Sequence, residues 1–278
     1  MIKSRHNSLT AAGVLALAVS ALLPLAQAGD WGGKEPKAPV EPTLDPIGAK
    51  VSVGYDSQYY FRGLWFSSNN VWSSVTASKE LSDTLALDLL TYYTDSASDT
   101  SGFDPSYSEL DLGLGLTYDA GFASFRLGYT YYYFFNQFFG NDIGQHYAHE
   151  VGLSTVIPVG MFNIGAGYYY DLFFDAHYFQ GSIDTTIAVT DRFSIVPAAT
   201  IGYSGSNYYA SFLPGLPFSA LDTDAFTHVG VNVSFPFQVT ENVVFAPYVA
   251  TNFSMDAREG LNPDTDDIWG GFSLTVSF

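Results

Sequence analysis

The sequence predicts an all-β protein: a transmembrane antiparallel up-and-down β-barrel of about twelve strands, preceded by a cleaved signal peptide. Three observations predict this fold. Apolar residues recur at every second position, which is the period of a strand with one apolar face. Only 14% of the residues are charged, whereas soluble domains carry about 25%. The last segment also alternates, and it ends on the aromatic residue Phe278.

The first 28 residues are expected to be a secretory signal peptide. Lys3 and Arg5 precede a short apolar stretch, and the segment 1–28 closes on an Ala-Gln-Ala cleavage pattern. Residues 29–47 hold four prolines, which favours an extended periplasmic lead-in. The barrel is then expected over residues 48–278, where no segment has the ~20 apolar residues that a membrane helix needs.

Twelve segments of the barrel region alternate between apolar residues and small or ionisable residues. The clearest is the fourth, in which four leucines from Leu110 to Leu116 alternate with Glu109, Asp111 and two glycines. One face of each segment is expected to meet lipid and the other the interior. In chain order the expected strands are 51–61, 71–77, 85–93, 110–118, 125–133, 147–157, 162–170, 179–189, 193–203, 229–235, 243–253 and 267–278.

The connections between these segments alternate in length, as expected for short periplasmic turns and longer outer loops. Both termini then lie in the periplasm, which requires an even number of strands. Aromatic residues gather at both ends of the segments, where their amphipathic rings suit the lipid headgroup level. The longer connections are expected at 62–70, 95–106, 135–145, 204–221 and 255–266.

The final segment, 267–278, is expected to close the ring by pairing with both the preceding strand and the first strand. Without the second pairing, strand edges would be open in lipid, which the membrane does not tolerate. A last strand with a terminal aromatic resembles the ending that the barrel insertion machinery recognises in outer-membrane barrels. Insertion machinery and outer-membrane lipid are therefore expected partners, the former through Phe278.

The inner face is expected to decide what the barrel does. Twelve strands ~4.8 Å apart, tilted by ~40°, give a backbone diameter of roughly 24 Å and a bore of ~10 Å. Many inner residues are small, which favours an open lumen. The residues expected to line the lumen are Asp56, Arg62, Asp88, Glu109, Asp111, Arg126, Glu150, Asp171 and Asp184. The residues expected to narrow it near the outer end are Tyr92, Tyr132, Phe134 and Tyr169.

Charge points to the solutes that such a lumen would admit. Acids outnumber bases on the inner face, which predicts a negative potential and a mild preference for cations. Removal of the signal peptide takes away Lys3 and Arg5, which leaves eight of the 10 Lys and Arg residues against 28 Asp and Glu residues. Such an acidic chain is not expected to bind nucleic acid. The chain has no cysteine, and no cofactor or metal is implied.

Three alternatives are weighed against a channel. A secreted β-sandwich would carry long polar side chains on its wet face, which these strands lack. The second alternative is a structural or adhesive barrel whose lumen is plugged. Single-channel conductance would distinguish such a barrel from a channel. An enzyme is not expected, because His146 and Glu150 share a strand face from which His149 points away. The acidic loop around Asp264 favours a solvated turn over a weak Ca²⁺ site.

One stretch carries a resemblance to a known family. Residues 57–63, with the sequence Ser-Gln-Tyr-Tyr-Phe-Arg-Gly, resemble the opening strand of the TorF-type porin family (the Gcw_chp domain). Fainter likenesses follow at 108–112, 127–134 and 168–171, although Gln58 stands where the family pattern has Asp. The resemblance implies passive transport without naming a solute, and it makes Arg62 a residue of special interest.

These observations together predict an outer-membrane channel for passive diffusion of small hydrophilic solutes, located in the outer membrane of a Gram-negative cell.

Overall fold

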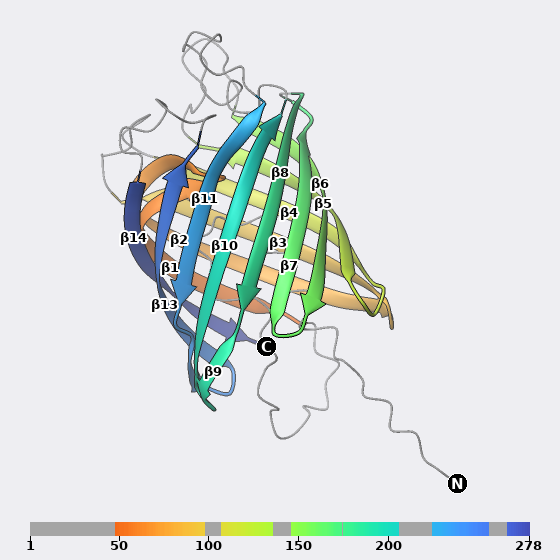
Figure 1. The fold of residues 1–278 in the computed structure, drawn as a ribbon, viewed down its shortest axis with the longest axis vertical. Coiled ribbons are helices and arrows are strands. Elements are labelled where there is room, and N and C mark those ends of the chain that lie inside the picture. The colour runs from red at the N-terminus through yellow and green to blue at the C-terminus, as the bar shows by residue number, and fades with distance from the viewer. Residues whose placement is uncertain (1–47, 98–106, 136–145, 174, 206–223, 256–265) are drawn as a thin grey trace.

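The computed structural model describes residues 48–97, 107–135, 146–173, 175–205, 224–255 and 266–278. These residues form one antiparallel sheet that closes on itself as a barrel (Figure 1). Within this described part, no helix is long and apolar enough to cross a membrane. The expected signal peptide 1–28, the lead-in 29–47 and the acidic loop at Asp264 lie outside the described residues.

Fourteen strand segments make up the sheet, and each pairs antiparallel with its neighbours. They are β1 (Lys50–Phe61), β2 (Leu64–Ser82), β3 (Leu85–Ser96), β4 (Ser108–Asp119), β5 (Ser124–Phe134), β6 (Tyr147–Val159), β7 (Phe162–Asp171), β8 (Ala176–Thr185), β9 (Ile187–Thr190), β10 (Phe193–Gly205), β11 (Ala225–Ser234), β12 (Phe237–Thr240), β13 (Val243–Ser254) and β14 (Asp266–Ser277).

The fourteen segments correspond to the twelve strands that the sequence predicts. β8 and β9 are one strand interrupted at Thr186, and both pair with β10. β11 and β12 are likewise one strand, interrupted at Phe235 and Pro236, and both pair with β10 and β13. Pro236 has no backbone N–H to donate to the ladder, although its carbonyl accepts a bond from the N–H of Ser194 at 3.1 Å.

The final strand closes the ring, as expected, by pairing with both the preceding strand and the first strand. β14 pairs with β13 from Val276 to Asp266 and with β1 from Ser277 to Gly271. The backbone N–H of Phe278 extends this seam by donating to the carbonyl of Ala49 at 2.9 Å. The ring therefore leaves no open edge along this stretch, which is the condition for a sheet in lipid.

The two faces of the wall differ as the alternation predicts. On β4, Leu112, Leu114 and Leu116 are exposed on the outside, whereas Glu109 and Asp111 are buried on the inside. The same alternation repeats on β3 and β5. Because the apolar side chains face outward and the polar ones inward, the barrel is built to be surrounded by lipid rather than by water.

The hairpin formed by β1 and β2 leaves the wall before it turns. β1 pairs with β14 only as far as Asp56, and β2 pairs with β3 only from Asn70 onward. Among the described residues, strand pairing within 57–69 therefore runs only between the two arms of the hairpin. Asn69 has a φ of 56°, and the pairing shifts from Tyr59–Ser67 to Tyr60–Trp65, so the β2 arm carries a bulge near the point where the hairpin departs.

This inward hairpin, defined as residues 57–69, corrects two expectations. The connection expected as a long outer loop at 62–70 is instead a two-residue turn at Arg62 and Gly63, because φ is positive at both residues (49° and 83°) and closes a tight hairpin. Tyr59, expected to face lipid, is 1% exposed. Once a hairpin lies inside the barrel neither of its faces meets lipid, so alternation no longer predicts exposure.

Candidate functional site

All nine ionisable residues expected on the inner face are buried in the structure, on strands that follow one another around the ring. Seven are carboxylates and two are arginines. They are Asp56 on β1, Arg62 in the turn, Asp88 on β3, Glu109 and Asp111 on β4, Arg126 on β5, Glu150 on β6, Asp171 on β7 and Asp184 on β8.

The two arginines are engaged in buried ion pairs. Arg126 reaches over β4 to Asp88 on β3, where its Nε lies 3.0 Å from Oδ1. Its guanidinium lies over Gly115 and Gly128, where a Cβ atom would collide with it. This pair therefore joins three adjacent strands, and the two glycines provide the space for it.

Arg62 makes the second ion pair at the tip of the inward hairpin. Its Nη1 donates to Glu150 Oε2 at 2.6 Å, and its Nη2 donates to Oε1 at 2.8 Å. Two parallel bonds between a guanidinium and a carboxylate form the geometry that gives such pairs their strength and direction. Glu150 is held in addition by the hydroxyl of Tyr132, which donates to Oε1 at 3.3 Å.

Aromatic rings surround the same guanidinium. The Cζ atom of Arg62 lies 4.5 Å from the ring centroids of Tyr169 and Tyr178, and 4.8 Å from that of Phe61. Cations within about 6 Å of a ring face are attracted by the ring's quadrupole, and more strongly when desolvated. Arg62 is therefore held by a carboxylate and two tyrosines at once.

The position of these partners shows that the hairpin crosses the lumen. Glu150, Tyr169 and Tyr178 belong to β6, β7 and β8, and β7 is halfway round the ring from β1. On another side, Asn252 of β13 donates to the carbonyl of Gly63 at 3.3 Å. The tip therefore contacts the wall opposite its origin.

The arms of the hairpin are fixed to the near wall by aromatic residues. Tyr59 and Tyr107 both donate their hydroxyls to Glu109 Oε2, Tyr59 at 3.0 Å. Tyr60, on the other arm face, stacks on Trp269 of β14 with ring centroids 4.5 Å apart. The two neighbouring tyrosines thus anchor the hairpin to opposite flanks.

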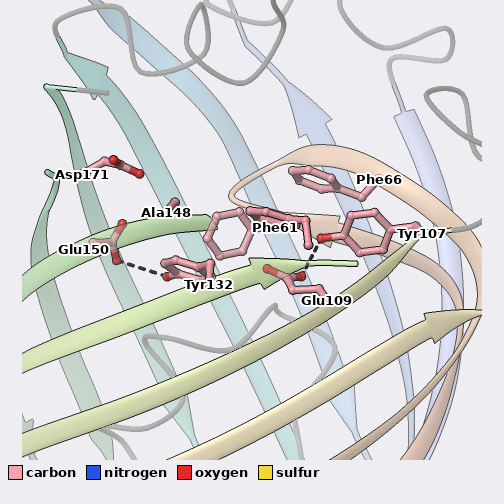
Figure 2. Close-up of a pocket in the computed structure, with 9 residues that line it drawn as sticks. Phe61, Phe66, Tyr107, Glu109, Tyr132, Ala148, Glu150 and Asp171 are labelled. Carbon is pink, nitrogen blue, oxygen red and sulfur yellow. Dashed lines mark hydrogen bonds between the residues drawn. The ribbon is translucent and has the colours of Figure 1, made fainter. Parts of the chain in front are cut away.

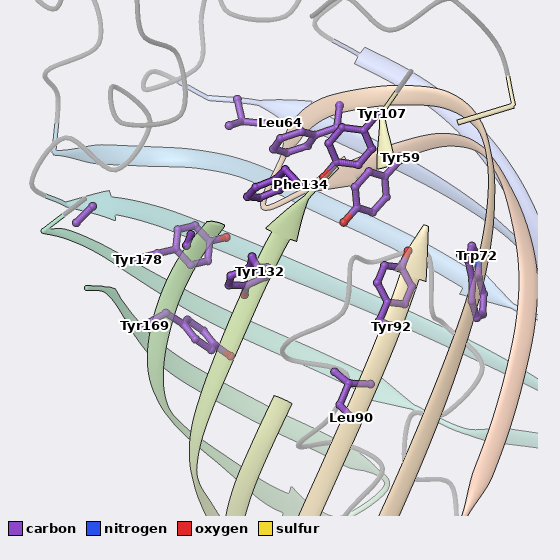
Figure 3. Close-up of a cluster of buried hydrophobic side chains, with 13 residues drawn as sticks. Tyr59, Leu64, Trp72, Leu90, Tyr92, Tyr107, Tyr132, Phe134, Tyr169 and Tyr178 are labelled. Atoms are coloured by element: carbon purple, nitrogen blue, oxygen red, sulfur yellow. The ribbon is translucent and has the colours of Figure 1, made fainter. Parts of the chain in front are cut away.

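The four residues expected to narrow the lumen lie in a larger buried cluster, shown in Figure 3. Tyr92, Tyr132, Phe134 and Tyr169 come from the wall and are at most 5% exposed. The sequence analysis missed the members that the hairpin adds, because these strands were expected to stay in the wall. The Arg-Gly pair between alternating segments was the available signal for a tight turn, although Asn-Gly or Asp-Gly would have been stronger. The cluster residues that the hairpin adds are Tyr59, Leu64 and Phe66.

Several glycines of the inner face lie under large side chains, whereas their small size was expected to favour an open lumen. A Cβ at Gly152 would lie 2.8 Å from the ring of Tyr169, and one at Gly167 would lie 2.7 Å from the same ring. Gly54 lies in the same way under the indole of Trp72. The small residues are therefore slots that large neighbouring side chains fill, and they preorganise those side chains against the wall.

A small cavity of about 10 Å³, which is room for about one water molecule, lies beside the hairpin tip (Figure 2). Its wall combines aromatic rings, among them Phe61, Phe66 and Tyr132, with the carboxylates Glu109 and Glu150. Glu150 therefore lines this cavity and binds Arg62 at the same time.

The histidines considered for catalysis are engaged with tyrosines or backbone. His149 Nδ1 shares a hydrogen bond with the hydroxyl of Tyr129 and stands among outward aromatic rings. His146 Nδ1 lies 3.1 Å from the carbonyl oxygen of Phe134. Within the described ranges, no group of three or more His, Asp and Glu residues could hold a metal ion.

No protein-family model matches the chain, and no curated protein matches it. The resemblance to the TorF-type porin family therefore stays a prediction. Solved structures do match. An outer membrane channel from Pseudomonas putida F1 is 14% identical with a TM-score of 0.54, covering 86% of this chain and 100% of that one.

Two further similar structures are porins by their descriptions. The KdgM porin is 10% identical with a TM-score of 0.47, covering 82% of this chain and 99% of that one. The NanC porin is 11% identical with a TM-score of 0.46, covering 83% and 98%. At these identities the likeness to the Pseudomonas channel concerns the fold, which is a β-barrel.

Proposed function

We propose that the chain is a porin-like channel of the bacterial outer membrane, which passes small hydrophilic solutes by diffusion and prefers cations. The observation that supports it is the inner face, where seven buried carboxylates face two arginines inside a closed ring. The barrel fold shared with an outer membrane channel is consistent with this role. In this proposal residues 1–28 direct export and 29–47 lie in the periplasm.

The proposal is tested by reversal potentials of the refolded protein in a planar bilayer with a KCl gradient. We expect K⁺ to be preferred over Cl⁻, because buried carboxylates raise the local concentration of cations. Asp184→Asn should move the reversal potential toward zero, since Asp184 is buried on β8 and has Asn163 as its hydrogen-bond partner at 2.9 Å. Asp83→Asn, in an exposed turn, is the matched control. A preference for Cl⁻ would contradict the proposal.

A second candidate is a structural or adhesive barrel that does not conduct. The inward hairpin is the observation that favours it, because its tip lies across the lumen from β1. Conductance separates the two candidates, and we place the channel first because the cavity beside the tip is lined by carboxylates as well as rings. We do not assign the barrel an enzymatic activity, since the histidines are engaged with tyrosines and backbone.

Phe278 is proposed to be the residue by which insertion machinery recognises the barrel. Its side chain is 71% exposed, while its backbone N–H completes the seam with β1. Phe278→Ala should therefore change the free energy of unfolding by less than about 0.5 kcal/mol. In cells the same variant should assemble several-fold less barrel, measured as heat-modifiable protein in outer-membrane fractions. Equal assembly of the variant and the wild type would show that the ring is not recognised.

A further inference from the structure

We propose that Glu150, Tyr169 and Tyr178 form a binding site for guanidinium or ammonium solutes, which Arg62 occupies as a tethered ligand. This inference rests on the proposed function and adds the class of solute that the channel would select. Arg62 is bound as a small cationic solute would be, through two hydrogen bonds to a carboxylate and contact with two ring faces.

The receptor and its occupant belong to different parts of the fold. Glu150, Tyr169 and Tyr178 lie on three adjacent wall strands, β6, β7 and β8, whereas Arg62 arrives on the hairpin from across the lumen. Removal of the guanidinium leaves the receptor residues on the wall. The site is thus a property of the barrel and not of the hairpin.

Neighbouring residues hold the receptor in shape. Tyr169 lies in the slot made by Gly152 and Gly167, where a Cβ would meet its ring at less than 3 Å. Tyr132 donates its hydroxyl to Glu150. Because these rings and this carboxylate are positioned by the wall, an incoming cation would lose little affinity to rearrangement of the site.

The surroundings favour a cation over a neutral or anionic solute. Glu109, Glu150 and Asp171 line the cavity, and Arg62 is the cation at the site among the described residues. Glu150 forms part of the wall of this small cavity as well as binding Arg62, so three carboxylates gather around one guanidinium. A cationic solute must displace the guanidinium of Arg62 to reach Glu150, so Arg62 acts as its tethered competitor.

The experiment uses propylguanidinium, which reproduces the end of an arginine side chain, and propylurea as its uncharged counterpart. Binding to refolded protein in detergent micelles is measured by titration calorimetry. We expect Arg62→Met to bind propylguanidinium and not propylurea. The wild type should bind it about 10²-fold more weakly, because a tethered competitor acts at high effective concentration. Adding Glu150→Gln to Arg62→Met should abolish binding.

Failure of folded Arg62→Met to bind, or equal binding of the two probes, would overturn the inference. If Arg62→Met folds only with propylguanidinium present, that dependence is itself binding. If Arg62→Met does not fold at all, the double variant Arg62→Met with Glu150→Gln is tested instead, because it leaves no unpaired charge at the site. Liposome flux of L-arginine over L-citrulline should then fall several-fold from the wild type, and an unchanged ratio would overturn the inference. Calorimetry measures binding whether or not the pore conducts. Binding without conductance would therefore contradict the proposed channel and leave the binding site supported.

Discussion

Gly271→Ala should prevent the barrel from closing stably. Gly271 of β14 is paired with Asp56 of β1 at the seam, and a Cβ there would collide with the backbone carbonyl of Tyr55. It would also lie 2.6 Å from the ring of Tyr248, so a rotamer change alone cannot relieve it. We expect the free energy of unfolding to fall by about 3 kcal/mol or more, as in severe overpacking. Urea unfolding in lipid vesicles measures it.

Gly205→Ala is the matched control for this prediction. The nearest atoms to a Cβ at Gly205 are 3.5 Å or more away, which is ordinary van der Waals contact. Alanine there should be neutral or slightly stabilising, because glycine loses more backbone freedom on folding. The unheated Gly271→Ala protein should also lose the compact gel mobility of a closed barrel. Equal stability of the two variants would show that the seam tolerates a separation of β1 from β14.

The wall of the barrel was predictable because alternation and lipid act on every strand in the same way. On β4, one leucine after another faces outward, and slipping the register by a single residue would place Glu109 and Asp111 in lipid. The same constraint places Arg126 inside. Strand number, closure and the inner position of the eight ionisable residues on the wall therefore follow from a local pattern.

The hairpin could not be predicted in this way, because its placement is a property of the whole ring. Whether residues 57–69 extend outward or fold inward depends on Glu150 and Tyr178, which come about 90 to 120 residues later and carry no pattern of their own. The expectation that inner-face glycines favour an open lumen was wrong for the same reason. Gly152 and Gly167 are small to admit Tyr169, and their size alone cannot distinguish a filled slot from open space.

The inward hairpin also determines how the interior charges are used. Seven carboxylates would leave a bare lumen strongly negative, yet two of them, Asp88 and Glu150, are paired with arginines. Glu109 is held by two tyrosine hydroxyls, one from the hairpin. The hairpin therefore adds side chains to the buried aromatic cluster and supplies part of the charge balance there. Its removal should change conductance more than any single substitution in the wall.

Replacement of residues 59–67 by Asn-Gly should raise single-channel conductance several-fold. Gln58 and Ser68 are paired across the hairpin, so a two-residue Asn-Gly turn can join them with the geometry that this turn prefers. The change removes Arg62, Phe66 and the two arm tyrosines from the lumen. Glu109 and Glu150 lose their hairpin partners, but an opened lumen hydrates them, so the barrel should still fold. Planar bilayer recordings in symmetric KCl measure the effect.

Arg62→Asn is the matched control, because it favours the same tight turn and leaves the hairpin at full length. The packed arms should hold it in the lumen, since Tyr60 remains stacked on Trp269 and Tyr59 remains bonded to Glu109. Its conductance should stay nearer to that of the wild type than to that of the shortened variant. If the shortened barrel conducts no better than the wild type, the hairpin is not the obstruction. The barrier would then have to lie with buried residues of the wall, such as Tyr92 and Trp72.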